Sequence, residues 1–223
     1  MSGFNEELAQ RIDTYIESVF VPADPVLAAN IANANAAGLP AINVTANQGK
    51  FLHLLARICG ARRILEIGTL GGYSTTWLGR ALPADGRLIT LEYSPVHAAV
   101  ARRNLAAAGL DGMVEVKVGD AAASMTAMIE AGEAPFDFIF IDADKVGYVK
   151  YLGLALRLAR PGTVIVAYNV IRNGAVMEEH PQDPSDFGGR AYNAEAAAHP
   201  RLDSIALPIF KNKIDGIAIS VVK

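Results

Sequence analysis

Cysteine is nearly absent from this chain of 223 residues, and neither sign of charge dominates it. The single cysteine, Cys59, cannot form an internal disulfide, which fits a reducing cytoplasm, and we expect it in the core. With 20 basic and 23 acidic side chains the formal net charge is −3, so we expect no basic face for nucleic acid or an anionic membrane. No apolar run approaches the ~20 residues of a membrane span, and the acidic start does not resemble a signal peptide. These absences predict a cytoplasmic globular protein with neither nucleic acid nor a membrane as a partner.

Zinc-binding patterns are lacking as well. The four histidines are scattered without the spacing of zinc ligands: His53, His97, His180 and His199. His180 follows Glu178 and Glu179 in a polar stretch, where a solvated loop is favoured over a role in a site.

From residue 63 onward, short β-branched runs alternate with longer helical stretches. Such short apolar runs are typical of strands covered on both faces, and the alternation predicts a Rossmann-like, doubly wound, mostly parallel α/β sheet. The predicted strands are Arg63–Gly68, Arg87–Tyr93, Met113–Val118, Phe136–Asp142 and Thr163–Asn169, and the helices between them are Tyr73–Leu82, Pro95–Gly109, Ala121–Ala131 and Tyr148–Ala159.

The first sixty residues depart from this alternation. They have helical character over Glu6–Val19, Pro25–Ala37 and Ala46–Cys59. We therefore expect a single domain over residues 1–223, in which residues 1–60 form a helical cap that contributes to the functional site and residues 61–223 form the core.

The region after the fifth strand is also different. Arg172–Gly189 is polar, and a loop of that length is either functional or disordered. A helix over Arg190–Ala198 and strands over Leu202–Phe210 and Gly216–Val222 are predicted to follow. The short turn around Asn212–Asp215 makes the last two strands an antiparallel hairpin at the sheet edge.

Glycines or acidic residues follow the first three strands, where ligands of a doubly wound sheet bind. Gly68, Gly71 and Gly72 allow a close backbone approach, Glu92 can accept hydrogen bonds from ribose hydroxyls, and Asp120 can meet an adenine edge. Each alone has a plainer interpretation. The glycines do not form G-x-G-x-x-G, Glu92 can be solvated, and Asp120 can cap a helix. Together they predict a nucleoside site.

The residue before the glycines bears on which nucleoside is bound. Glu66 would repel a pyrophosphate, but it suits a ligand that carries an ammonium and a sulfonium group. This favours S-adenosylmethionine over a nicotinamide dinucleotide.

Four segments occur in the order EIGTLGGYST, LEYSP, GDA and IDADK. In this order and spacing the chain resembles the cation-dependent class I O-methyltransferases of the caffeoyl-CoA and catechol type. The resemblance runs from about Ile42 to the last residue, and the earlier PADPVL is similar too. It implies a seven-stranded sheet, a homodimer, S-adenosylmethionine as cofactor and a divalent cation of the Mg²⁺ type.

The resemblance also implies a role for each matching position. The residues expected to bind S-adenosylmethionine are Val44, Glu66, Gly68, Thr69, Ser74, Glu92, Asp120, Ala121, Asp142 and Asp144. Asp142 and Asn169 match metal ligands, Lys145 a residue beside the acceptor hydroxyl, and Asn173 a position that touches the acceptor. A phenol has a pKa near 10, so a cation or a lysine is needed to make its oxygen nucleophilic.

One position departs from the family pattern. The family ends its fifth strand with Asp-Asn, both metal ligands, whereas this chain has Tyr168-Asn169. Because Mg²⁺ usually needs one or two carboxylates, this change predicts a weakened or absent metal site. The alternatives are a replacement ligand such as Asp144, metal-free transfer in which Lys145 and Tyr168 orient the acceptor, a Tyr168 that is not the natural residue, and a Tyr168 without any role.

We therefore expect an S-adenosylmethionine-dependent O-methyltransferase that acts on a small phenolic or catechol-type hydroxyl by in-line transfer, with Lys145, Asp142 and Tyr168 as the catalytic group. The alternatives are a non-catalytic or metal-independent adenosylmethionine-binding protein and, with less support, a nicotinamide-dependent oxidoreductase.

Overall fold

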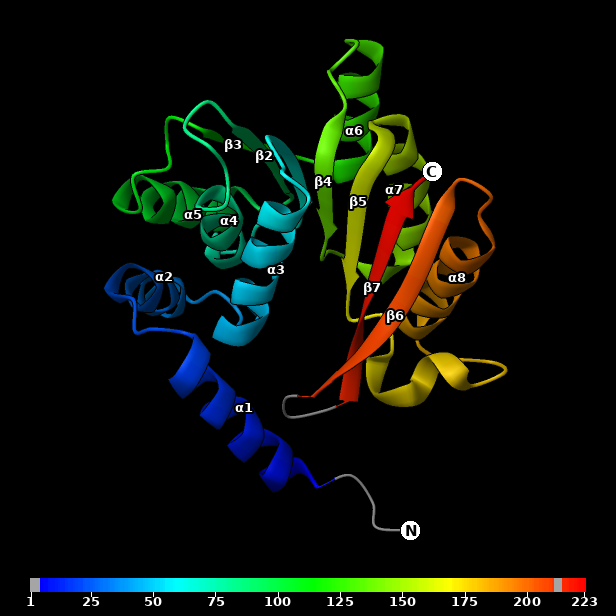
Figure 1. The fold of residues 1–223 in the computed structure, drawn as a ribbon, viewed down its shortest axis with the longest axis horizontal. Coiled ribbons are helices and arrows are strands. Elements are labelled where there is room, and N and C mark those ends of the chain that lie inside the picture. Colours follow the sequence, from blue (N-terminus) through cyan, green and yellow to red (C-terminus); the bar gives the residue numbers. More distant parts are fainter. Residues whose placement is uncertain (1–4, 211–213) are drawn as a thin grey trace.

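The computed structural model describes residues 5–210 and 214–223 and has the predicted α/β architecture (Figure 1). The elements before the sheet are α1 (Glu6–Phe20), α2 (Pro25–Ala36) and α3 (Ala46–Ile58). The alternating core contains β1 (Arg63–Ile67), α4 (Tyr73–Gly79), β2 (Arg87–Glu92), α5 (Pro95–Ala107), β3 (Val114–Val118), α6 (Ala121–Glu130), β4 (Phe136–Ile141), the 3₁₀ turn η1 (Lys145–Gly147), α7 (Tyr148–Arg157) and β5 (Ala159–Tyr168). After it come the 3₁₀ segment η2 (Arg172–Met177), α8 (Pro184–Ala198), β6 (Leu202–Phe210) and β7 (Ile214–Val222).

The strands form one seven-stranded sheet in the order β3-β2-β1-β4-β5-β7-β6. The first five strands in the chain are parallel, whereas β7 is antiparallel to both β5 and β6. The predicted mostly parallel sheet with an antiparallel hairpin is confirmed. The strand order reverses between β1 and β4, so the carboxyl ends of these two strands flank the switch point where such folds bind ligands.

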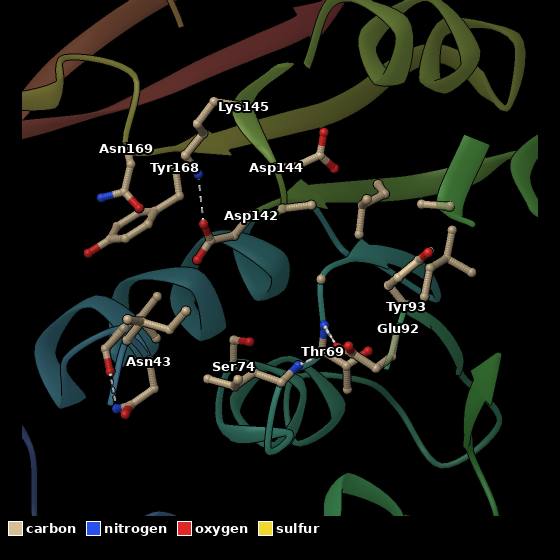
Figure 2. A pocket seen from close by; sticks show the side chains of 18 of the residues that line it. Asn43, Thr69, Ser74, Glu92, Tyr93, Asp142, Asp144, Lys145, Tyr168 and Asn169 are labelled. Atoms are coloured by element: carbon tan, nitrogen blue, oxygen red, sulfur yellow. Dashed lines mark hydrogen bonds and ion pairs between the residues drawn. The ribbon is translucent and has the colours of Figure 1, made fainter. Parts of the chain in front are cut away.

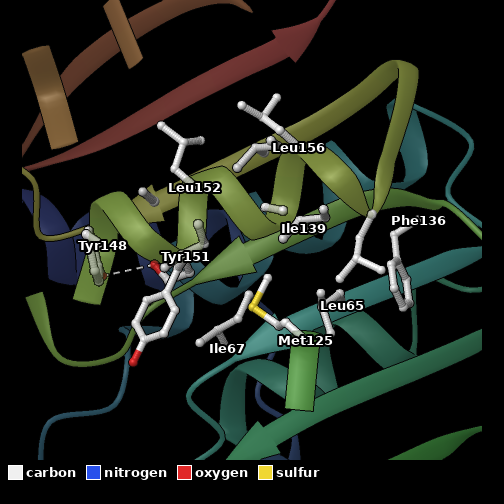
Figure 3. Packing of buried hydrophobic residues seen from close by; sticks show 14 of the residues in the cluster. Leu65, Ile67, Met125, Phe136, Ile139, Tyr148, Tyr151, Leu152 and Leu156 are labelled. Carbon is white, nitrogen blue, oxygen red and sulfur yellow. Dashed lines mark hydrogen bonds between the residues drawn. The ribbon is translucent and has the colours of Figure 1, made fainter. Parts of the chain in front are cut away.

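Both faces of the sheet are covered by helices. Leu65 and Ile67 of β1 face the layer of α6, α7 and α8, whereas Ile64 faces the layer of α2 to α5. Figure 3 shows α7 packed over the sheet, and its Leu152 and Leu156 belong to the same buried cluster as Ile139 of β4. Burial on both faces explains why these strands are continuous apolar runs. None of the helices in the described ranges is long and apolar enough to cross a membrane.

The predicted long loop over Arg172–Gly189 is wrong in most of its length, because it contains η2 and the first turns of α8. The helix begins at Pro184, not Arg190: Asp183 caps it by accepting a hydrogen bond from the Ser185 amide at 2.7 Å, and proline suits the first helical position. Within α8, position 188 requires glycine because the helix packs closely against the backbone of Lys145 there. A Cβ at that position would lie 2.2 Å from the Lys145 carbonyl oxygen.

Smaller differences concern the ends of elements. β5 begins at Ala159, earlier than predicted, and α4 ends at Gly79 instead of Leu82. Asp215, predicted in a turn, lies in β7 and is paired with Ile209, whereas Asn212 is outside the described residues. Cys59 is half-buried at the end of α3 and packs against the core from its margin.

Candidate active site

A cavity of about 960 Å³ opens at the carboxyl ends of β1, β2, β4 and β5. Figure 2 shows two groups of polar side chains across it: Glu92 and Thr69 on one side, and Asp142, Lys145 and Tyr168 on the other. The segment before α3 also lines the cavity. The volume is at the upper end of the range for small-molecule sites.

The turn after β1 needs glycine because two strand ends meet there. Gly68 has a φ of 97°, and a Cβ on it would lie 2.0 Å from the Asp142 carbonyl oxygen at the end of β4. The turn therefore brings the backbone of residues 68–70 to the floor of the cavity.

Glu92 lines the cavity and holds this turn. One carboxylate oxygen accepts hydrogen bonds from the amides of Thr69 at 3.2 Å and Leu70 at 2.8 Å. The other oxygen accepts from the Ser94 amide at 2.9 Å and lies 3.3 Å from Nδ1 of His97. Glu92 thus fixes the position of the glycine turn relative to the end of β2.

Glu66 does not line the cavity, and its carboxylate is completely buried beneath it. It accepts hydrogen bonds from the hydroxyls of Ser74 at 2.6 Å and Thr90 at 2.7 Å, and from that of Thr75. Burial raises the pKa of Glu66 to about 7, because the three hydroxyl donors offset only part of the lost hydration. The side chain joins β1, β2 and α4 under the cavity floor.

The third strand end supplies Asp120 and Ala121, which line the cavity. Asp120 also caps α6 by accepting a hydrogen bond from the Ala123 amide at 2.7 Å, so the simpler interpretation of this residue holds beside the functional one. Asp144, after β4, accepts from the Gly147 amide at 2.9 Å and from the Tyr151 hydroxyl.

Lys145 places its ammonium group in the cavity wall opposite Glu92 (Figure 2). Its side chain is only 8% exposed, and Nζ donates to Asp142 at 3.0 Å and to the Tyr148 hydroxyl at 2.6 Å. Burial, followed by the charge of Asp142, raises the pKa of Tyr148 well above its ordinary value, so this phenol stays neutral. Its hydroxyl lies 2.9 Å from the Tyr168 carbonyl oxygen, to which it donates. Lys145 is thus held at the junction of β4 and β5.

Tyr168 ends β5, and its hydroxyl donates to Oε1 of Gln48 on α3. The same Gln48 oxygen accepts a hydrogen bond from the Thr45 amide at 2.8 Å as part of a capping box. The capping box therefore fixes the position of Oε1 of Gln48. Burial, followed by the charges of Asp142 and Asp215, raises the pKa of Tyr168 well above its ordinary value. The residue therefore presents a neutral phenol.

Asn169 follows Tyr168 and turns its amide toward Asp215 of β7. Nδ2 donates to one carboxylate oxygen of Asp215 at 2.9 Å, and the other oxygen accepts from the amides of Ile171, Arg172 and Gly216 at 3.2, 3.0 and 2.8 Å. Burial alone would raise the pKa of Asp215, but these hydrogen bonds outweigh it and lower the pKa.

These residues do not fit a hard divalent cation. Of the two expected ligands, Asp142 is paired with Lys145 and Asn169 offers only an amide, and Tyr168, where the family pattern has a third ligand, is a neutral phenol. Within residues 5–210 and 214–223 no group of three or more His, Cys, Asp or Glu residues is placed to hold a metal ion. Mg²⁺ prefers an octahedral set of oxygens that includes carboxylates, and the group here supplies fewer than it needs.

The family model described as O-methyltransferase matches residues 21–221. This chain belongs to the O-methyltransferase family. The catechol O-methyltransferase of Niastella koreensis is 48% identical over 220 residues, which cover 98% of this chain and 100% of that protein. The O-methyltransferase of Bacillus cereus, solved in complex with SAH, superposes with a TM-score of 0.96 at 45% identity and covers 98% of this chain and 100% of its own. TomG of Streptomyces achromogenes, an O-methyltransferase of tomaymycin synthesis solved with SAM, has a TM-score of 0.94 at 39% identity and 99% coverage of both chains.

The predicted family and activity, an S-adenosylmethionine-dependent O-methyltransferase of class I, are confirmed. The O-methyltransferase cavity gathers nearly every position expected to take part, namely Val44, Gly68, Thr69, Ser74, Glu92, Asp120, Ala121, Asp142, Asp144, Lys145, Tyr168 and Asn169. Two predicted positions do not line it: Glu66 lies beneath the floor, and Asn173 is exposed outside.

Among the cavity residues that the sequence-based prediction missed, two make the contacts that hold Tyr168 and Asn169. Gln48 lies three residues after Thr45, a spacing that predicts a helix start but not a bond to Tyr168. Asp215 lies in an Asp-Gly pair, which favours a turn and gives no sign of a role in a cavity.

Proposed function

We propose that this O-methyltransferase transfers the methyl group of S-adenosylmethionine to one hydroxyl of a small catechol-type phenol without a metal ion. The observation that carries the proposal is the wall of the cavity. The buried Lys145 and the half-buried Asp142 form an ion pair there, while Tyr168 occupies the position at which the resemblance expects a carboxylate. The catechol O-methyltransferase of Niastella koreensis supports the acceptor class.

We assign the donor to the glycine-turn side of the cavity. Gly68, Thr69 and Ser74 would line its methionine end, Glu92 its ribose, and Ala121 with Asp120 its adenine, and Val44 and Asp144 would add contacts. The SAH and SAM complexes of the Bacillus and Streptomyces relatives support this assignment. Glu66 would act from below, because it fixes Ser74 through their hydrogen bond.

The chemistry that we propose uses the protein's own charges. The acceptor oxygen attacks the methyl carbon in line with the C–S bond, and the electron pair of that bond neutralises the sulfonium. Asp142 takes the hydroxyl proton as general base, and the Lys145 ammonium stabilises the phenolate as it forms. Tyr168 remains a neutral phenol and shapes the acceptor side.

The test is methyl transfer from labelled S-adenosylmethionine to a panel of catechols, with Mg²⁺ and again with EDTA. We expect the two rates to agree within about twofold, because no hard-cation site has to be filled. Tyr168→Asp should gain Mg²⁺ affinity and a rate that EDTA lowers, and Tyr168→Phe, which adds no ligand, serves as the control. Loss of turnover of the natural protein in EDTA would contradict the metal-free mechanism, and no transfer to any catechol would contradict the acceptor class.

We also propose a single-domain organisation in which residues 1–60 cap the core and close the site. Val44 and Gln48 support this, because both come from residues 1–60 and line the cavity together with Asp142, which follows β4, and Tyr168, which ends β5. A cytoplasmic location is part of the same proposal and rests on the lone, half-buried Cys59. A secreted, disulfide-linked form would contradict it.

A homodimer is proposed from the exposed apolar surface of the N-terminal helix. Leu8, Ile12, Tyr15, Val19 and Phe20 of α1 are 49–65% exposed, and Figure 1 shows α1 extending away from the sheet. The neighbouring edge strand β6 exposes further apolar side chains. We expect sedimentation equilibrium to give the mass of two chains and Ile12→Glu to lower it toward one. The mass of one chain for the natural protein would contradict the dimer.

The alternatives make different predictions. A non-catalytic binder of adenosylmethionine does not need the Lys145–Asp142 ion pair in the cavity and would bind the donor without turnover. An oxidoreductase would bind a dinucleotide, for which the buried carboxylate of Glu66 behind the glycine turn is unsuitable.

A further inference from the structure

The turn after β5 has an uncommon backbone. Asn169, Arg172 and Asn173 have φ values of 57°, 51° and 54°, in the left-handed region that residues other than glycine rarely adopt. Three such residues within five positions need to be held in place by the surrounding structure.

Asp215 of β7 supplies that restraint. One of its oxygens accepts from the backbone amides of Ile171 and Arg172, both inside the turn, and from that of Gly216 on its own strand. The residue is only 3% exposed, so these hydrogen bonds are shielded from water. One buried anion therefore joins the turn after β5 to the start of β7.

The other oxygen of Asp215 determines the orientation of the Asn169 side-chain carboxamide. A carboxylate can only accept, so the NH₂ of the Asn169 carboxamide has to point at Asp215, which it does at 2.9 Å. The carbonyl oxygen of the carboxamide is then on the other side. Both residues line the cavity, and Figure 2 shows Asn169 beside Tyr168, with its nitrogen turned away from Asp142.

We propose that Asp215 is a positioning residue that makes Asn169 a hydrogen-bond acceptor in the cavity and thereby selects an acceptor with two adjacent hydroxyls. The inference rests on the proposed function. One hydroxyl reacts beside Lys145 and Asp142, and the neighbouring hydroxyl donates to Oδ1 of Asn169. A monohydroxyphenol cannot make this second bond, which leaves the amide oxygen without a partner.

Asp215→Asn tests the inference with almost no change of shape. The new carboxamide at position 215 can keep its oxygen toward the three backbone amides, and its NH₂ then faces Asn169. The carboxamide of Asn169 has to flip and present NH₂ to the cavity, where an acceptor is needed. We expect KM for a catechol to rise by about tenfold or more, the preference for a catechol over the matching monohydroxyphenol to fall by a similar factor, and the affinity for S-adenosylhomocysteine to stay the same.

The exchanged pair, Asn169→Asp with Asp215→Asn, provides the rescue. The new carboxylate at position 169 accepts from the new NH₂ at position 215 and again offers an oxygen to the cavity. Aspartate, like asparagine, tolerates the left-handed backbone. We expect KM and the catechol preference to return to within about threefold of the natural values. Asp203→Asn, the same change at an exposed position of β6, should alter neither quantity.

Two results would overturn the inference. One is an unchanged KM and catechol preference in Asp215→Asn, and the other is an exchanged pair as impaired as the single variant. If the natural protein transfers no methyl group at all, the proposed function fails, and NMR still decides the positioning role. The side-chain amide protons of Asn169, assigned by their loss in Asn169→Asp, should exchange slowly with water beside Asp215 and faster in Asp215→Asn. Equal exchange rates would refute the positioning role.

Discussion

Replacement of Lys145 by methionine is expected to lower kcat for methyl transfer by about a thousandfold, with the affinity for S-adenosylhomocysteine within about threefold of the natural value. The Lys145 ammonium lies 3.0 Å from Asp142, so its removal takes away the positive charge that stabilises the phenolate while Asp142 accepts the hydroxyl proton. Methionine keeps the length and apolar stem of lysine and removes only the charge and its donors. Initial rates and calorimetric titration separate the two quantities.

Lys150→Met is the matched control, because Lys150 is exposed on α7, five positions further along the chain. It should leave kcat unchanged. Lys145→Arg keeps the charge but brings a planar, larger group into a cavity wall that fits a single ammonium, so we expect only partial activity. A decrease of less than tenfold in Lys145→Met would show that another group activates the acceptor.

The second large effect concerns stability and arises from Glu66. The pKa of its completely buried carboxyl rises from 4.5 to about 7 on folding, which corresponds to about 3 kcal/mol in the free energy of unfolding. Between these pH values the folded state binds the proton more often than the unfolded state. The contribution of Glu66 to stability is therefore fully present below pH 4.5 and is lost as the pH rises to about 7.

Urea unfolding of the natural protein and of Glu66→Gln at several pH values from 4.5 to 8 measures this contribution as a difference. Glu66→Gln should gain relative stability as the pH rises and level off above about 7. The difference is needed because His53, whose pKa burial lowers, makes stability rise with pH over part of the same range. Glu130→Gln, at an exposed position, is the control. A stability difference that does not vary with pH would mean that Glu66 is already ionised in the folded state at low pH.

The sequence predicts the sheet well because burial on both faces makes each parallel strand a short apolar run bounded by polar residues, as in β1 and β4. The start of α8 is the main error. The Asp183-Pro184 pair is a helix-start signal, but Gly188 and Gly189 weigh against a helix on local propensity alone. The presence of glycine in this helix is explained by tertiary packing, because Gly188 lets α8 approach the backbone of Lys145.

The candidate site, too, has one part that the sequence predicts and one part that it does not. Residues at strand ends, such as Glu92, Asp142 and Lys145, can be predicted because the topology itself brings strand ends together. Contacts between distant segments cannot. The bond between Tyr168 and Gln48 spans 120 positions in the chain, and that between Asn169 and Asp215 spans 46. No local pattern carries such pairings.

The place of β7 between β5 and β6 has a consequence for the way the molecule is made on the ribosome. β6 is translated before β7, yet within the described sheet it pairs with β7 and with no other strand. Until β7 emerges, β5 has an open flank and β6 lacks its partner strand, so the sheet is complete only after β7 has been translated. Asp215 arrives with that strand. The nascent chain can thus pair β1 to β5 first, whereas the turn at Asn169 obtains its hydrogen bonds to Asp215 only when β7 is present.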